Sequence, residues 1–253
     1  MGGEQFRMGG GKRGSGARNY TKDAPAGLLN AGNTCFANSS LQSLLATTAF
    51  RSIVMKGMKK SVKLSPGKVK NLKTPERRSL RNKTKVTEWL VNELSTLKAE
   101  VDKGRGKAAD ASRITRNIEK LSPCMTSGRQ EDAHEFILAV LNSLSLEGSN
   151  RTLRELFDGK MESCVTCQSC GNCSKREERF TDLSLEISST DVNSVLSALD
   201  AFLEEEDLGE DNLVECVRCK KKRMVTKGLK LTETLPKILT FHLKRFEYDR
   251  FGR

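Results

Sequence analysis

The sequence has no long apolar run, and histidine is scarce. No stretch approaches the roughly 20 apolar residues that span a bilayer, and the N-terminus lacks the apolar core of a secretory signal. The start Met-Gly-Gly-Glu-Gln-Phe also lacks the Ser or Thr that an N-myristoylation signal carries at its sixth position. We therefore expect an intracellular protein, cytoplasmic and/or nuclear, with no membrane contact.

The scarcity of histidine limits the choice of a catalytic base. Only His134 and His242 occur in 253 residues, and histidine is the side chain whose charge changes most readily near neutral pH. Cysteine is more plentiful, and without a secretory signal its pattern favours metal ligation or catalysis over a disulfide framework. The eight cysteines are Cys35, Cys124, Cys164, Cys167, Cys170, Cys173, Cys216 and Cys219.

Charge is unevenly spread along the chain. Hydrophobic residues make up 36% and charged residues 30%, so part of the chain should be exposed. Residues 1–23 contain seven glycines and several basic residues, which predicts a disordered, positively charged tail. Residues 51–85 carry thirteen Lys or Arg and one acid, a net charge of +12 that equals the net charge of the whole chain. We predict a basic surface insertion in the form of a solvated loop; nuclear import or nucleic-acid binding is the alternative.

The stretch 27–44 places a cysteine at the predicted start of a helix. Gly32 permits backbone angles that other residues resist, and Asn33 and Thr34 are helix-capping residue types, so the helix should begin close to Cys35. A thiol at a helix N-terminus feels the positive end of the macrodipole, which favours the nucleophilic thiolate. Cysteine is also among the most buried residue types. From these residues alone, a nucleophile and a buried structural cysteine remain equally good interpretations.

Further helices are predicted in the N-terminal half. Apolar spacing predicts a helix over 86–103 and a shorter helical piece around Ile114 and Ile118. After Gly128, the spacing of Phe136, Ile137, Val140, Leu141 and Leu144 predicts another helix with an acidic first turn. His134 at its start is a candidate base for Cys35, although a histidine in this position more often caps or packs.

Two cysteine knuckles indicate a zinc site. The run 164–173 contains three overlapping Cys-x-x-Cys pairs, and 216–219 contains another. Zinc takes four thiolates tetrahedrally, two from each tight turn. Spacing alone does not show which of the pairs 164/167, 167/170 and 170/173 binds the metal. The alternative to a zinc site is four reduced cysteines without a metal.

The C-terminal half reads as strands around one helix. Residues 180–187 alternate as a strand, and 195–203 form an amphipathic helix that ends in the acidic run 204–207. This run either receives a basic partner surface or is a solvated helix end. Residues 227–246 read as two strands joined at Leu235-Pro236.

Four blocks, in this order, resemble the catalytic domain of the ubiquitin-specific proteases. Residues 27–44 resemble their cysteine box, and 130–136 resemble their Q-x-D-A-x-E-F block. The two knuckles and the elements between them resemble their zinc-bearing fingers, and 235–246 resemble their H-L-K-R-F strand. The resemblance runs from about residue 27 to residue 246, interrupted by the basic insertion.

The resemblance implies an α+β, papain-like cysteine protease hand. The implied parts are a basic insertion at 51–85, a helical thumb at 86–160, fingers at 161–232 and the start of a β-rich palm at 233–253, all within a partial catalytic domain at 24–253. The implied partners are ubiquitin and ubiquitinated proteins, and the implied cofactor is structural Zn²⁺. The implied site residues are Cys35 as nucleophile, Asn30 as oxyanion donor, Asp132 and Glu135 as substrate-binding residues, and Cys167, Cys170, Cys216 and Cys219 as zinc ligands, which leaves Cys164 and Cys173 as spare thiols.

One departure from the family pattern concerns the general base. The catalytic His of the family lies in a block after the H-L-K-R-F strand, and this chain ends before such a block. We therefore expect a C-terminally incomplete catalytic domain that is inactive on its own. The alternatives are a non-catalytic ubiquitin-binding zinc protein and a basic, zinc-dependent nucleic-acid binder.

Overall fold

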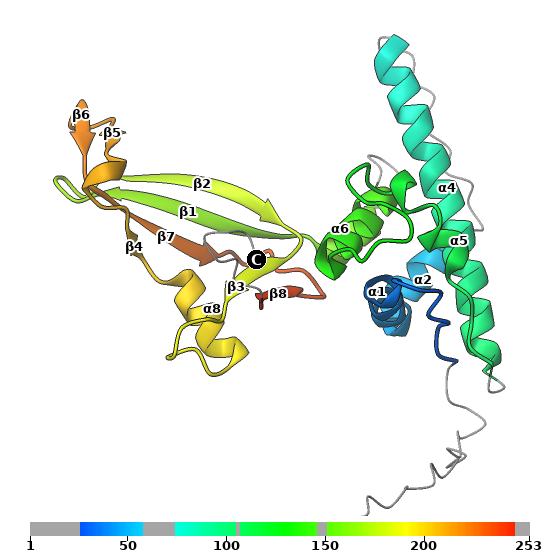
Figure 1. Ribbon diagram of the computed structural model, residues 1–253. Coiled ribbons are helices and arrows are strands. Elements are labelled where there is room, and N and C mark those ends of the chain that lie inside the picture. The colour runs from blue at the N-terminus through cyan, green and yellow to red at the C-terminus, as the bar shows by residue number, and fades with distance from the viewer. Residues whose placement is uncertain (1–25, 58–73, 105–106, 146–150, 246–253) are drawn as a thin grey trace, which may run out of the picture.

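The protein consists of a helical part and a long twisted sheet that extends away from it (Figure 1). The computed structural model describes residues 26–57, 74–104, 107–145 and 151–245. Each part has its own buried apolar cluster, one among the helices and one around the sheet. No described helix is long and apolar enough to cross a membrane.

The helical part is built around four helices that pack on one another in pairs. Helix α1 packs on α6 and α2, and α4 packs on α6 and α2. Phe36 of α1 meets Phe136 of α6 edge to face, with ring centroids 5.6 Å apart. The helices are α1 (Cys35–Ala46), α2 (Thr48–Gly57), α4 (Thr74–Lys103), α5 (Ser112–Thr115), the 3₁₀ helix η1 (Ile118–Lys120), α6 (Ala133–Leu144) and α7 (Arg151–Phe157).

The prediction of a solvated loop over the basic segment 51–85 is wrong for residues 51–57 and 74–85, which are helical. Helix α2 continues to Gly57, and α4 begins at Thr74 rather than near 86. Lys and Arg are good helix formers, and α4 also gains tertiary support. Thr87 is fully buried, and its hydroxyl donates to the carbonyl of Ser143 in α6 at 2.6 Å. Residues 58–73, like the predicted tail 1–23, lie outside the described residues.

Four antiparallel strands form the main sheet in the order β2-β1-β7-β4. Strand β1 lies next to β2, and Gly159 of β1 faces the Phe180 ring so closely that a Cβ would lie 2.4 Å from it. A small β5–β6 hairpin sits at the far end of the sheet (Figure 1). The strands are β1 (Gly159–Cys167), β2 (Cys173–Phe180), β4 (Glu206–Asp207), β5 (Val214–Cys216), β6 (Lys221–Arg223) and β7 (Val225–Leu231), with the 3₁₀ helix η2 (Glu210–Asn212) before β5.

A second, parallel pair of strands lies between the main sheet and the helices. Strand β3 (Leu183–Glu186) pairs with β8 (Phe241–Lys244). The prediction of one strand over 180–187 is therefore wrong, because β2 ends at Phe180 and β3 begins at Leu183. Between them, the Thr181 side chain bonds Asp158 and the Asp182 side chain bonds His134. The last predicted strand begins only at Phe241, because the backbone N–H of Ile238 donates to Leu156 of α7 at 2.9 Å instead.

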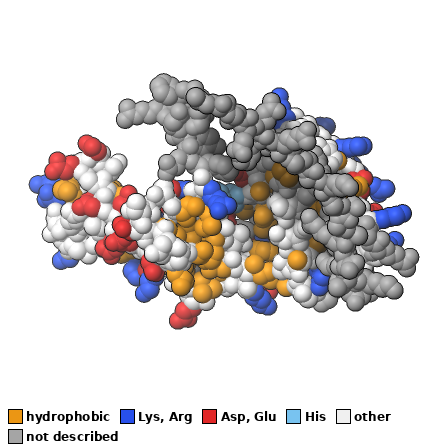
Figure 2. All heavy atoms as spheres, turned by 60° about the horizontal axis from the view of Figure 1, so that its bottom comes forward, with side chains coloured by type: hydrophobic (Ala, Val, Ile, Leu, Met, Phe, Trp, Pro, Cys, Tyr) orange, Lys and Arg blue, Asp and Glu red, His pale blue; other side chains and the backbone are white. Residues whose placement is uncertain are grey.

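The helix predicted over 195–203 is confirmed as α8 (Val195–Leu203). It begins at Ser194, whose hydroxyl accepts from the backbone N–H of Ser197 in a reciprocal capping box. Apolar side chains gather on the face that Figure 2 turns forward. Val195 and Leu196 of α8 are among the exposed apolar residues of the described chain.

Candidate functional site

Cys35 is the first residue of α1, and its side chain is exposed. The predicted helix start is therefore confirmed, although Thr34, the residue before it, makes no side-chain cap. The Thr34 hydroxyl instead accepts from the backbone N–H of Ala31 at 3.2 Å and donates to Asn30 Oδ1 at 3.0 Å. Gly32 has a φ of 111° in this turn, a conformation that glycine adopts far more readily than other residues.

The turn before α1 also orients Asn30. Its side-chain oxygen accepts hydrogen bonds from the hydroxyl and the backbone N–H of Thr34, at 3.0 and 3.4 Å. Asn30 is exposed. Because Thr34 engages the amide oxygen, the amide nitrogen is the end of Asn30 that is left to meet a substrate oxygen.

Gln130 lies directly against the Cys35 thiol. Its Nε2 is 3.3 Å and its Oε1 is 3.5 Å from Cys35 Sγ. Sequence reasoning assigned Gln130 no role, although it opens the Q-x-D-A-x-E-F block that was recognised. A polar side chain at the edge of a recognised block is the signal that could have found it.

The loop that carries Gln130 is held by carboxylates on both of its sides. Glu119 accepts from the backbone N–H of Ser127 at 2.7 Å, and Glu131 accepts from that of Thr126 at 2.8 Å. The N–H of Ser127 lowers the pKa of Glu119 below its ordinary value. The Glu119 bond fixes the loop on η1, and the Glu131 bond closes the loop on itself just before α6, so the approach of Gln130 to Cys35 is set by the surrounding structure.

Asp132 and Glu135 lie at the start of α6. Asp132 is its N-cap, and Oδ1 accepts from the backbone N–H groups of His134 and Glu135 at 2.7 and 3.0 Å. This bond gives Asp132 a structural role that the sequence did not predict. Glu135 is exposed in the first helical turn. Their predicted contact with substrate stays a prediction.

The two histidines contact each other rather than Cys35. The rings of His134 and His242 are stacked, with centroids 3.9 Å apart and planes 8° from parallel. His134 Nε2 lies 2.8 Å from Asp182 Oδ2, and His242 Nδ1 lies 3.1 Å from the Ser184 hydroxyl. This cluster joins α6 to the β3–β8 pair, which gives both histidines a structural role.

The four cysteines predicted as zinc ligands meet at the far end of the sheet. The Sγ atoms of Cys167, Cys170, Cys216 and Cys219 all lie within 4.8 Å of one another. The two knuckles have the same turn, because Gly171 N–H donates to Cys167 O and Lys220 N–H to Cys216 O, each at 2.8 Å. The structure thus selects the 167/170 pair from the three that spacing allowed.

The chemistry of this cluster fits a metal that binds thiolates. Cys167 and Cys216 are buried, and Cys170 and Cys219 are half-buried. The backbone N–H of Cys219 lies 3.5 Å from Cys216 Sγ and lowers the pKa of the Cys216 thiol to about 6. Zinc binds the deprotonated sulfur, and this N–H favours that form at Cys216, while the neighbouring cysteines raise the pKa of the Cys170 thiol.

Cys164 and Cys173 form a disulfide, so the prediction of two spare thiols is wrong. Their sulfurs are 2.01 Å apart and their Cα atoms 5.9 Å apart. The register of β1 and β2 explains the contact, since Thr166 pairs with Cys173 and Cys164 pairs with Lys175. Two residues that are diagonal neighbours across an antiparallel pair lie within reach of each other, and spacing along the chain does not reveal this.

Comparison with known proteins identifies the family. A sequence model of the family described as ubiquitin carboxyl-terminal hydrolase matches residues 26–253. The chain belongs to this family. Its similarity to curated members covers most of the chain but only part of each relative.

The relatives of this chain are longer proteins. Ubiquitin carboxyl-terminal hydrolase 15 of Arabidopsis thaliana is 32% identical over 247 residues, which is 91% of this chain and 24% of the relative. Ubiquitin carboxyl-terminal hydrolase 3 of Homo sapiens is 30% identical over 268 residues, which is 90% of this chain and 50% of the relative. The chain thus spans between about a quarter and a half of these two proteins.

Solved structures of the family share the fold. The SAGA Ubp8/Sgf11/Sus1/Sgf73 DUB module bound to ubiquitin aldehyde matches with a TM-score of 0.68 at 24% identity, over 92% of this chain and 50% of that chain. The same module bound to monoubiquitin matches with a TM-score of 0.65 at 26% identity, over the same shares. The α+β fold of a ubiquitin-specific protease catalytic domain, predicted from the sequence, is confirmed.

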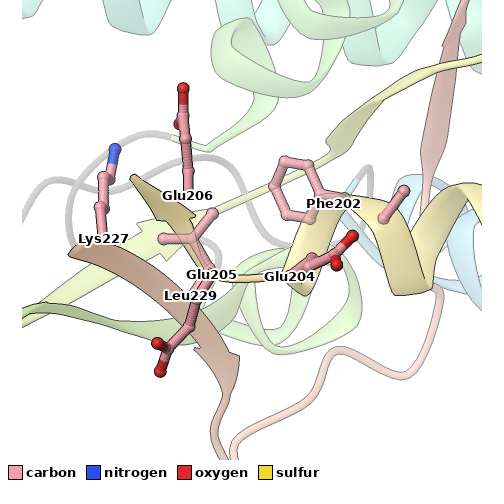
Figure 3. A pocket seen from close by; sticks show the side chains of 7 residues that line it. Phe202, Glu204, Glu205, Glu206, Lys227 and Leu229 are labelled. Carbon is pink, nitrogen blue, oxygen red and sulfur yellow. The ribbon is translucent and has the colours of Figure 1, made fainter. Parts of the chain in front are cut away.

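A separate cavity lies between α8, β4 and β7 (Figure 3). It has a volume of about 340 Å³ and is lined by apolar Phe202 and Leu229, by Lys227, and by the glutamates of the acidic run. The acidic run 204–207 is therefore not only the end of α8, because its last two residues form strand β4. None of the lining residues belongs to the Cys35 site.

Proposed function

We propose that this chain forms the thumb and fingers of a thiol-dependent deubiquitinase, which cleaves the peptide or isopeptide bond after the C-terminal glycine of ubiquitin. The proposal rests on one observation above all. This member of the family presents an exposed thiol, Cys35, at the first turn of α1, in contact with the side-chain amide of Gln130.

The proposed reaction begins with attack of Cys35 Sγ on the carbonyl carbon of the terminal glycine. The π electrons of the carbonyl move to its oxygen, which the amide nitrogen of Asn30 and the backbone N–H of Cys35 would bind. A donor of this kind is typically worth about 3 kcal/mol of transition-state stabilisation. Collapse of the intermediate expels the lysine amine, which takes up a proton, and leaves a thioester that water then hydrolyses.

The proton acceptor for Cys35 is proposed to be a group other than this chain's two histidines. His134 and His242 are stacked on each other and bound to Asp182 and Ser184. Loss of the base in triad enzymes lowers the rate by roughly 10⁴–10⁶. We therefore propose that the 253-residue chain alone turns over ubiquitin conjugates negligibly.

The proposed cofactor is a structural zinc ion held by the four clustered cysteines, Cys167, Cys170, Cys216 and Cys219. The metal would supply a crosslink between the ends of the β1–β2 and β5–β6 hairpins and would take no part in bond cleavage. The four sulfur atoms, which all lie within 4.8 Å of one another, support this assignment.

Asp132 and Glu135 are proposed to help seat the basic C-terminal tail of ubiquitin. Glu135 is exposed at the start of α6, and the same segment carries Gln130 against the thiol. Asp132 already caps the helix. A Glu135→Gln variant should therefore weaken ubiquitin binding without affecting the helix.

The decisive experiment uses ubiquitin that carries a C-terminal electrophile. The chain should form a covalent adduct at Cys35, faster than with the same electrophile on a short peptide, and Cys35→Ser should form none. Fluorogenic ubiquitin should be hydrolysed negligibly by the chain, and robust Cys35-dependent turnover would contradict the missing base. Saturable ubiquitin binding without an adduct would instead support a non-catalytic ubiquitin-binding zinc protein.

A further inference from the structure

Gln130 is the side chain that touches the reacting sulfur. Among the hydrogen bonds of the described residues, those of Cys35 Sγ go to Gln130 Nε2 at 3.3 Å and Oε1 at 3.5 Å. The amide offers both a donor and an acceptor to the sulfur. It can accept from the thiol S–H and can donate N–H to the thiolate.

This contact is set by the surrounding loop. Asn33, two residues before Cys35, donates its side-chain N–H to the carbonyl of Gly128 at 3.1 Å. Gly128 has a φ of 81° and turns the chain toward Gln130. The bond between Asn33 and Gly128 therefore ties the start of α1 to the loop that carries Gln130. Glu119 and Glu131 hold the same loop through its backbone N–H groups.

Three acidic side chains and one histidine near this loop are engaged elsewhere. Glu119 and Glu131 face the backbone N–H groups of the loop, and Asp132 faces those of α6. His134 faces Asp182 and His242. The neutral amide of Gln130 is thus the polar group that the fold brings to the sulfur.

We propose that Gln130 is a further catalytic residue, which donates its amide N–H to the Cys35 thiolate and holds that sulfur in place for attack. The inference rests on the proposed function, in which Cys35 is the nucleophile. In the attack, a sulfur electron pair forms the bond to the carbonyl carbon, and the negative charge passes to the carbonyl oxygen. Gln130 Nε2 then no longer faces an anion, and so it stabilises the thiolate more than the thioester.

The expected effect has opposite signs at low and high pH. Loss of one hydrogen bond to a charged atom shifts an equilibrium by about tenfold at the lower end of its range, so the thiolate fraction near pH 7 should fall about tenfold. The remaining thiolate is more nucleophilic, by about threefold for a Brønsted coefficient of ~0.45. Alkylation should therefore slow by about threefold near pH 7 and quicken by about threefold at a pH high enough to ionise the thiol in every variant.

The test measures the rate at which iodoacetamide alkylates Cys35 in the full chain, with peptide mass spectrometry to resolve each cysteine. Gln130→Leu removes donor and acceptor at similar size, and Gln130→Glu keeps the shape but replaces the donor with a negative charge. Both variants should be alkylated more slowly than the wild type near pH 7 and faster at high pH, which is the crossed pH pattern. The loss of rate near pH 7 should be larger in Gln130→Glu. Gln168→Leu, a change at a distant exposed amide that bonds Asp207, is the matched control.

Two results would overturn the inference. One is an unchanged Cys35 rate in both Gln130 variants. The other is a change by the same factor at both pH values, which would indicate altered access and not a lost bond to the thiolate. Cys124, an exposed thiol in the same digest, serves as the internal reference. No ubiquitin is present in this assay, so a crossed pattern together with failure of the ubiquitin adduct would refute the proposed function, and with it the catalytic role of Gln130, but would leave intact the hydrogen bond from Gln130 to the Cys35 thiolate.

Discussion

The two knuckles of the cysteine cluster differ at the residue that follows their second cysteine, and this difference predicts their contributions to metal binding. Each knuckle ends in a residue with left-handed backbone angles, Gly171 with a φ of 67° and Lys220 with a φ of 54°. Lys220 is the only non-glycine residue with positive φ among those described. A residue with a Cβ is strained by roughly 1–2 kcal/mol in this conformation, whereas glycine is not.

Lys220→Gly should therefore tighten zinc binding. Relief of about 1–2 kcal/mol of strain is partly offset by about 0.5–1 kcal/mol of additional chain entropy that glycine loses on folding. The net gain of about 0.5–1 kcal/mol corresponds to roughly two- to fivefold in affinity. Gly171→Ala should have the opposite effect by the same reckoning, roughly two- to fivefold weaker, for conformational reasons alone because a Cβ at Gly171 meets no atom within 4 Å.

The assay is competition for zinc with a chromophoric chelator of known affinity, on the full chain under reducing conditions. Lys221→Gly, at a neighbouring exposed position in β6, is the control for loss of a lysine side chain. An affinity that falls in Lys220→Gly, or that stays unchanged in Gly171→Ala, would refute the argument from backbone strain.

Two further predictions concern stability. The pKa of Glu119 is lowered by the backbone N–H of Ser127, so this bond stabilises the fold above the unfolded pKa, and its contribution is lost as pH falls through the lower folded pKa. Thermal unfolding between about pH 3 and 7 should show a smaller loss of stability on acidification in Glu119→Gln than in the wild type; equal slopes would contradict this. Reduction of the Cys164–Cys173 disulfide should remove about 2–3 kcal/mol of stability, given a closed loop of about ten residues. Denaturant titration with and without reductant measures this loss, and a Cys164→Ser/Cys173→Ser variant insensitive to reductant is the control.

Sequence reasoning found the elements whose signals are local. The start of α1 at Cys35, the α6 helix and the bounds of α8 all follow from apolar spacing and capping residues. The two Cys-x-x-Cys knuckles were also visible in the sequence, because each is a self-contained turn, although spacing left three possible pairs in the first of them. Family resemblance supplied the α+β fold as a whole, which the matching structures bear out.

The features that were missed depend on register and on contacts between distant segments. Spacing along β1 could not reveal that Cys164 and Cys173 meet diagonally across the β1–β2 pair. The break at Thr181-Asp182 arises because Asp182 turns toward His134, 48 residues away. Gln130 reaches Cys35 across 95 residues. Pairing of this kind is fixed by tertiary packing, which local propensity does not encode.

The short segment before and into α6 performs three tasks. Gln130 contacts the thiol, Asp132 caps the helix, and His134 docks on the β3–β8 pair. Because Asp132 accepts from the backbone N–H of His134, the histidine cannot shift without disturbing the cap. Seating of the strands on the helices should therefore influence how firmly Gln130 is held against Cys35.

A variant at the far side of the histidine stack tests this coupling. His242→Ala removes the ring that covers His134 but leaves every residue of the Cys35 site unchanged. Loss of a stacked aromatic contact is worth about 0.5–1.5 kcal/mol beyond the buried area, and some of this should appear as a looser loop. We expect Cys35 alkylation near pH 7 to change in the same direction as in Gln130→Leu but by a smaller factor, and the effect should vanish when Gln130→Leu is already present. Additive effects of the two variants would mean that the stack and the thiol contact are independent.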